Sequence, residues 1–170
     1  MRRALDAVYD GAAWLAALMM VGLLAMVLIS IAGRQLHFHL PGTDAYAGYL
    51  MAGAGFLSLA HTLRRGEHIR VTLLLQALQG VPRRAVELWS LSVATLLAFA
   101  FAFYSVRLAW QSHLFHDVST SNDATPLWIP QLAMAAGAAL FAIAMLDEWV
   151  AVVRGGRLAP TADGEPLRNE

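Results

Sequence analysis

The chain has 170 residues, of which 58% are hydrophobic and 14% are charged, and its formal net charge is zero. A soluble domain of ordinary composition carries about 25% charged residues, so this composition argues against a soluble protein. A net charge of zero provides no bulk attraction to nucleic acid. The chain contains no cysteine, which excludes thiol–disulfide chemistry and metal sites built from thiolates.

Four long apolar runs along the chain contain no Asp, Glu, Lys or Arg. A helix needs about 20 apolar residues to cross the hydrocarbon core of a bilayer, and each run has about that length. We therefore predict an all-α membrane protein with four transmembrane helices. The first run exceeds the apolar core of a typical secretory signal peptide, so we expect it to be retained. The four runs are residues 11–33, 45–63, 88–106 and 126–146.

The arginines are distributed unevenly between the two sides that these spans define. Ten of the twelve basic residues fall on the side of the N-terminus, and only Arg34 and Arg107 fall on the other side. Because cytoplasmic loops carry the excess of positive charge, both termini are predicted to be cytoplasmic. The five tryptophans agree, since all lie near predicted span ends, at the headgroup level that indole prefers.

A basic segment connects the second and third predicted spans. Within it, Val71, Leu74, Leu75 and Leu78 follow helical spacing before Gly80 ends the pattern. This spacing predicts a short helix in the plane of the membrane surface. Two further apolar residues fall off the stripe, which leaves open that the segment is buried against protein. We predict one transmembrane domain over 1–155 and a flexible cytoplasmic tail over 156–170, where the chain is polar and contains Pro and Gly.

Small residues gather in the second and fourth predicted spans. They allow helix backbones to approach closely, which is a main source of helix association in lipid. The second span is therefore our first candidate for a helix buried against protein. The candidate helix-packing residues are Gly48, Ala52, Gly55 and Gly137.

The predicted spans contain no charged side chain at mid-depth, which proton relays and ion pathways require. His61, near the end of the second run, is interpreted as an interfacial histidine. The outer-loop pairs His37/His39 and His113/His116 leave open an alternative, a small metal- or haem-binding electron-transfer membrane protein. Apart from that alternative, we predict no catalytic residue, no metal site, no cofactor and no enzyme activity.

Charged residues beside the spans are candidate contacts for a partner subunit or for lipid. Arg34 and Asp44 bracket the first outer loop, where they pair with each other, anchor the helix ends or bind a periplasmic partner. Arg64 and Arg65 begin a basic cluster that acts as a topology determinant and a contact for anionic lipid, or as a docking surface for another subunit.

The stretch RRGEHIRV, residues 64–71, is the most specific sequence pattern in the chain. Together with the residues around it, it resembles the small membrane subunit of tripartite ATP-independent periplasmic (TRAP) transporters, the DctQ-like family. The likeness runs from about residue 1 to 155, and it adds Glu67, His68, Arg70 and Asp117 to the candidate contacts. Many members place Glu, often beside Trp, at the start of the second span, where this chain has Asp44. The other matching positions are Arg34, Pro82, Ser112 and residues 117–120 and 128–131.

The resemblance implies a function that depends on partners. It implies a large multi-span membrane subunit that holds the substrate and Na⁺ sites, and a periplasmic substrate-binding protein that captures an organic acid. This chain would then be the small scaffold subunit of a Na⁺-coupled secondary transporter in the bacterial inner membrane, surrounded by membrane lipids. The resemblance implies no role for nucleic acid.

Overall fold

The computed structural model describes residues 2–38, 40–65, 81–121 and 123–154. Over these residues the chain forms four helices, one over each predicted apolar run, although the last helix begins at Trp128, two residues after its run starts. The prediction of an all-α chain is therefore confirmed. The predicted interfacial helix and the predicted tail lie outside the described residues. The helices are α1 (Arg2–Gln35), α2 (Thr43–Arg64), α4 (Val81–Leu114) and α5 (Trp128–Val153).

The helices extend beyond the apolar runs from which they were predicted. Both α1 and α4 have 34 residues, and their additional turns carry charged residues such as Asp6 and Arg84. An apolar run marks only the part of a helix that must tolerate hydrocarbon. Ala, Leu, Arg and Glu are good helix formers in any solvent, so the backbone continues as helix past the last apolar turn.

Three of the described helices are long and apolar enough to cross a membrane, over Leu5–Gln35, Arg84–Leu114 and Trp128–Val153. The remaining helix, α2, is not in this group although it has 22 residues. Its glycines, two tyrosines and His61 lower its hydropathy. A fourth span was predicted here from the lack of charge, and that part of the prediction remains a proposal.

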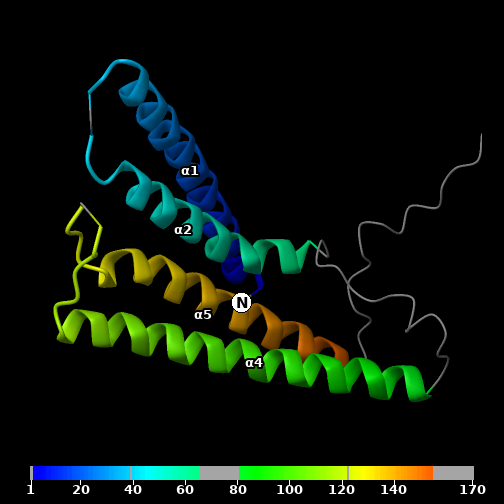
Figure 1. The fold of residues 1–170 in the computed structure, drawn as a ribbon. Helices are drawn as coiled ribbons and strands as arrows, with labels where there is room; N and C mark the ends of the chain where they lie inside the picture. Colours follow the sequence, from blue (N-terminus) through cyan, green and yellow to red (C-terminus); the bar gives the residue numbers. More distant parts are fainter. Residues whose placement is uncertain (1, 39, 66–80, 122, 155–170) are drawn as a thin grey trace, which may run out of the picture.

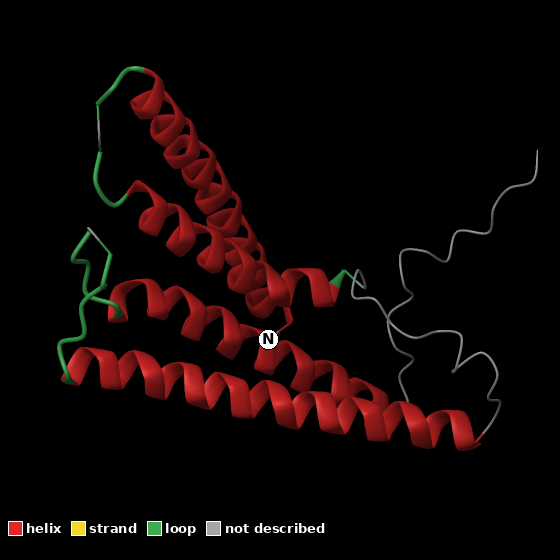
Figure 2. Ribbon diagram, in the orientation of Figure 1, coloured by secondary structure: helices red, strands yellow, loops and turns green. Residues whose placement is uncertain are grey.

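The helices form two hairpins, α1–α2 and α4–α5, which meet where α2 packs on α5 (Figure 1). Because α2 contacts α1 on one side and α5 on the other, it lies inside the array. Both hairpin loops, residues 36–42 and 115–127, lie at the same end of the molecule, here called the loop end (Figure 2). The start of α1 and the end of α2 lie together at the opposite end, here called the terminal end.

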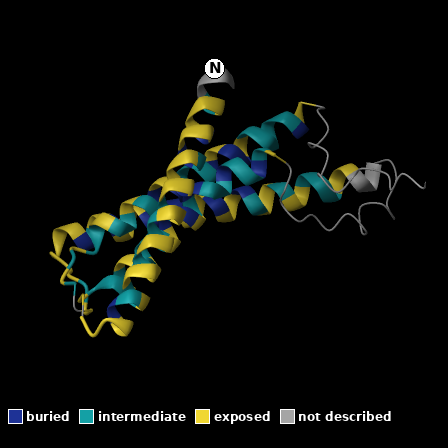
Figure 3. Cartoon of the chain, turned by 90° about the horizontal axis from the view of Figure 1, so that it is seen from above, coloured by how far each residue is buried: buried dark blue, intermediate teal, exposed yellow. Residues whose placement is uncertain are grey.

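The interface between the helices is built mainly from alanine. Ala60, Ala138 and Ala142 are at most 1% exposed, whereas long side chains such as Leu18 and Leu96 point outward and are at least 65% exposed. Figure 3 shows this pattern along the helices, with buried residues confined to the contacts between them. Close packing of small residues inside and large apolar residues outside is the pattern expected of helices that associate in lipid.

The loop end is closed by contacts between the two loops. Gly42 precedes α2 with a φ of 85°, and a Cβ atom there would lie 2.9 Å from the Cβ of Asp123 in the second loop. Because glycine has no Cβ atom, it can adopt this left-handed backbone conformation and allow the close approach of Asp123. Within the second loop, the backbone N–H of Ser119 donates to the carbonyl of Thr125 at 2.8 Å. The loops therefore form one connected surface.

Candidate functional site

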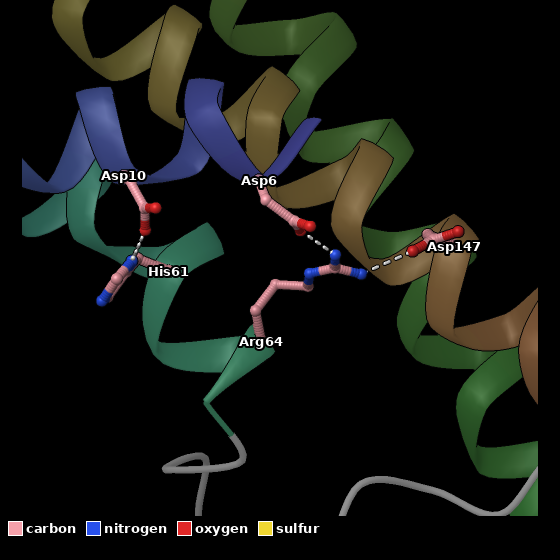
Figure 4. Close-up of polar contacts among 5 residues, drawn as sticks. All are labelled: Asp6, Asp10, His61, Arg64 and Asp147. Carbon is pink, nitrogen blue, oxygen red and sulfur yellow. Dashed lines mark hydrogen bonds and ion pairs between the residues drawn. The ribbon is translucent and has the colours of Figure 1, made fainter. Parts of the chain in front are cut away.

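Arg64 joins three helices at the terminal end. It is the last residue of α2, and its Nη1 donates to Asp147 Oδ2 of α5 at 2.7 Å, while its Nη2 donates to Asp6 Oδ1 of α1 (Figure 4). The C-terminal end of a helix favours a cation, and the guanidinium fork has enough donors for two carboxylates at once. The side chain of Arg64 is only 26% exposed, so this network is partly shielded from water.

The surroundings of Arg64 stabilise its charged form. Burial alone would lower the pKa of Arg64, but the hydrogen bond to Asp6 and the charges of Asp6 and Asp147 outweigh burial and raise it. The guanidinium carbon also lies 5.4 Å from the ring centroid of Tyr9, which is 2% exposed. Arg64 is therefore a permanent cation that links α1, α2 and α5.

Two further contacts at the terminal end link neighbouring helices. His61 Nδ1 of α2 lies 3.3 Å from Asp10 Oδ1 of α1 (Figure 4). Trp149 Nε1 of α5 donates to Ser92 Oγ of α4 at 2.8 Å. The predicted interfacial His61 thus has a carboxylate neighbour, Asp10, which was not predicted from the sequence.

At the loop end, α2 is tied to the second loop through two tyrosines. The hydroxyl of Tyr49 donates to Asp123 Oδ2 at 3.1 Å, and the hydroxyl of Thr125 donates to that of Tyr46 at 3.1 Å. The two tyrosine rings pack edge to face with centroids 6.0 Å apart. Partial burial would raise the pKa of Asp123, but interactions with Ser119, Thr125 and Tyr49 favour the carboxylate and lower it.

The predicted contacts Arg34, Asp44 and Asp117 all lie at the loop end. Arg34 Nη2 is 3.9 Å from Asp44 Oδ1, and both side chains are at least 74% exposed. Ser30 Oγ also donates to Asp44 Oδ1, at 3.4 Å. Asp117 is exposed as well, and its backbone carbonyl accepts from Leu127. An ion pair so exposed contributes little to stability, so these charges remain accessible to a partner.

The four predicted packing residues divide into two groups. Gly137 is buried, and a Cβ atom there would lie 2.5 Å from the carbonyl carbon and oxygen of Phe56, so it sets the close approach of α5 to α2. Gly48, Ala52 and Gly55 are exposed, and a Cβ atom at Gly48 or Gly55 would meet nothing within 4 Å. These three, spaced i, i+4 and i+7, form one face of α2 that turns away from α1 and α5.

The match to a known family decides how these surfaces are interpreted. Residues 23–155 match the model of the family described as tripartite ATP-independent periplasmic transporters, DctQ component. The chain belongs to this DctQ family. This DctQ component is a multi-pass membrane subunit of a bacterial TRAP transporter and is not an enzyme, as the sequence predicted. No curated protein matches the chain.

Part of the most specific sequence pattern of this DctQ component lies outside the described residues. Glu67, His68 and Arg70 fall in this part, and their predicted contacts remain predictions. The first two residues of the pattern, Arg64 and Arg65, are described, and their surroundings differ. Arg64 is held in the three-helix network, whereas Arg65 is exposed and caps the end of α2.

The outer-loop histidines of this DctQ component were the basis of the metal- or haem-binding alternative. The rings of His113 and His116 have centroids 6.5 Å apart, and His113 packs against Trp128 at 5.2 Å. His37 lies in the first loop, and His39 lies outside the described residues. Among the described residues, no three His, Cys, Asp or Glu side chains come together as a metal site would require.

Several residues that link the helices of this DctQ component were not predicted from the sequence. Asp6 and Asp147 lie outside the apolar runs and were not among the candidate contacts, and neither were Tyr46, Tyr49 and Asp123. A usable signal was present, because Asp6 and Asp147 lie just outside predicted spans, on the same side as Arg64. Charges at the same depth on neighbouring helices tend to pair, because unpaired charges near hydrocarbon are costly.

Proposed function

We propose that this DctQ component is a fixed, non-catalytic scaffold subunit of a Na⁺-coupled TRAP transporter that imports organic acids. The observation that carries the proposal is the lack of any charged side chain over residues 11–33, 45–63, 88–106 and 126–146 of a chain that belongs to a tripartite transporter. Ion-coupled transport places polar groups and broken helices at mid-depth. These groups would belong to a large membrane subunit, and a periplasmic binding protein would capture the substrate.

In this proposal all four helices cross the inner membrane and residues 1–155 form one domain. The 22 residues of α2 rise about 33 Å, which is enough for a hydrocarbon core of about 30 Å. Its neighbours α1 and α5 cover one face of it, which includes Gly53 and Ala60, and shield that face from lipid. The shared loop end supports an arrangement with both termini on one side, and the arginine distribution indicates that this side is the cytoplasm.

The outward face of α2 is the proposed contact for the large subunit. Gly48, Ala52 and Gly55 offer a smooth surface on which a helix of another chain could approach closely. Arg34, Asp44 and Asp117 lie at the loop end, where a periplasmic binding protein would dock. Exposed charges of both signs suit a transient, electrostatically guided encounter.

The proposal is tested by co-expressing the chain with a tagged large subunit of the same TRAP transporter. Ala52→Leu and Gly55→Leu add bulk to the outward face of α2, and each is expected to reduce co-purification and uptake at least tenfold. Ala100→Leu is the matched control, since Ala100 is also an exposed alanine in the middle of a helix. Full uptake by the large subunit without this chain would refute the scaffold function.

The coupling ion and substrate class are tested in proteoliposomes that contain the whole transporter. Uptake of radiolabelled carboxylates should require the binding protein and a Na⁺ gradient, and it should not be supported by a proton gradient alone. Uptake that persists without Na⁺, or that excludes every carboxylate tried, would contradict these parts of the proposal and leave the scaffold function unaffected.

A further inference from the structure

The adjacent residues Arg64 and Arg65 look equivalent in sequence but have different surroundings. Arg64 is occupied by two carboxylates and is 26% exposed. Arg65 follows it at the end of α2, is exposed, and within the described part of the chain forms no ion pair. A guanidinium binds phosphate groups in a bidentate manner, and the exposed guanidinium of Arg65 is accessible to such a group.

Arg65 lines a hollow of about 450 Å³ between α1 and α2 at the terminal end. The wall on α1 is formed by Asp10, Ala13, Trp14 and Ala17, and His61 completes it on α2. The two alanines leave room for an apolar chain, and Trp14 is 74% exposed at their side. Because exposed indole rings settle at headgroup level, the hollow lies where lipid headgroups meet acyl chains.

The hollow contains one positive and one negative side chain. This pair favours some lipid headgroups over others. Arg65 is a cation that forms no ion pair with any described residue, and Asp10 is a carboxylate whose side chain is 66% exposed. Only Asp10 Oδ1 is in contact with His61, at 3.3 Å (Figure 4), so the second oxygen can accept further hydrogen bonds. A purely anionic headgroup would be attracted by Arg65 and repelled by Asp10.

We propose that this hollow binds one phospholipid whose headgroup carries both a phosphate and a primary ammonium, as in phosphatidylethanolamine. The phosphate would bind Arg65, the ammonium would donate to Asp10, and one acyl chain would lie along Ala13 and Ala17. The lipid would fill the seam between α1 and α2 and hold the first hairpin closed at the membrane surface. This site does not depend on the proposed scaffold function.

The test measures lipid retention by the purified full-length chain with native mass spectrometry. Equimolar phosphatidylethanolamine, phosphatidylglycerol and phosphatidylcholine are offered together. We expect one phosphatidylethanolamine to be retained at least fivefold over either competitor, because the quaternary ammonium of phosphatidylcholine has no N–H to donate. Equal retention of all three lipids would overturn the proposal, as would equally tight binding of water-soluble glycerophosphoethanolamine.

Two substitutions separate the proposed contacts. Arg65→Gln should weaken binding of every phospholipid at least tenfold, and Asp10→Asn should remove the preference for phosphatidylethanolamine over phosphatidylglycerol while keeping a lipid bound. Arg107→Gln is the matched control, because Arg107 is an exposed arginine on α4 that does not line this hollow. A loss with Arg107→Gln equal to that with Arg65→Gln would show nonspecific attraction and refute the site.

The transporter complex provides a second test, because a partner helix is the alternative occupant of the hollow. If the lipid is part of the assembled transporter, the wild-type complex with the large subunit should retain it. Arg65→Gln should then remove the lipid and leave the complex intact. Loss of the lipid from the wild-type chain when the complex forms would show that protein fills the hollow instead.

Discussion

At the scale of single residues, the sequence shows which side chains are charged, but it does not show what surrounds each charge. Arg64 and Arg65 are consecutive arginines in one basic cluster, yet only Arg64 reaches both Asp6 and Asp147. The difference arises from the direction of each side chain at the end of α2, about 100° apart around the helix axis. Arg64 points between α1 and α5, and Arg65 lies exposed beside the hollow between α1 and α2. Sequence spacing alone does not reveal which one faces the neighbours.

Arg64 is expected to stabilise the fold more than any exposed arginine does. Arg64→Gln should lower the free energy of unfolding in detergent by about 1–3 kcal/mol, because Asp6 and Asp147 lose their shared cation while partly buried. The free energy of unfolding of Arg64→Lys should lie between those of the wild type and Arg64→Gln, since one ammonium binds two carboxylates less well than a guanidinium fork does. The measurement is denaturant titration followed by tryptophan fluorescence.

Arg65→Gln is the neighbouring control, with an expected change within about 0.5 kcal/mol for an exposed position. Equal losses for Arg64→Gln and Arg65→Gln would show that the ion network contributes nothing specific.

Asp123 is expected to make the loop end sensitive to acid. Its pKa in the folded chain lies below the ordinary value of about 3.9. Its stabilising contribution is therefore fully present above that value and is lost as the pH falls through the lower, folded pKa. The difference in melting temperature between wild type and Asp123→Asn should be constant near neutral pH and should vanish in acid.

Asp117→Asn serves as the control for Asp123, because Asp117 is an exposed carboxylate in the same loop. If the two variants had the same pH profile, the contacts of Asp123 with Tyr49 and its neighbours would not be responsible.

At the scale of elements, α2 combines an inward face and an outward face made of equally small residues. Gly53 and Ala60 are buried against neighbouring helices, and Gly48 and Gly55 are exposed. The sequence showed that α2 is rich in small residues and predicted that it is buried against protein. It did not separate the residues that pack inside the chain from those left for a partner, because both faces satisfy the same chemical preference.

One added methyl group is expected to change stability differently at the α2–α5 contact and on the outward face of α2. Gly137→Ala should destabilise the isolated chain by about 1–3 kcal/mol, because its Cβ atom would collide with the backbone of Phe56. Gly55→Ala should be neutral or stabilise by up to about 1 kcal/mol, since nothing lies near and alanine favours helix. Unfolding titrations of both variants decide this, and a stable Gly137→Ala variant would refute the close α2–α5 contact.

At the scale of the whole molecule, two hairpins meet along α2 and α5 with both loops at one end (Figure 1). Contacts that tie the hairpins together occur at both ends, through Arg64 with Asp147 and through Tyr49 with Asp123. The middle is held by alanine packing. Polar links at the ends and small residues between them suit a rigid body in a membrane, because charged links avoid the hydrocarbon.

This arrangement predicts that both loops are labelled from the same side of the membrane. The chain has no cysteine of its own, so Leu36→Cys and Phe115→Cys, both at positions 70% exposed, can each be introduced without background. Both should react with a membrane-impermeant maleimide applied from the periplasm. Arg154→Cys, at the terminal end, should react only after permeabilisation. Labelling of the two loops from opposite sides would contradict the arrangement.

The sequence by itself determined the all-α class, the apolar core of each helix and the family of this protein. These follow from composition, from runs without charge and from residue order, which are local properties of the chain. Only the tertiary structure decided which helices are neighbours, that Arg64 connects three of them while Arg65 is exposed, and which glycines are buried. The physical reason is that the same small or charged residue suits an internal contact, a lipid headgroup or a partner chain equally well. The choice among these depends on the direction in which each side chain points once the helices have packed.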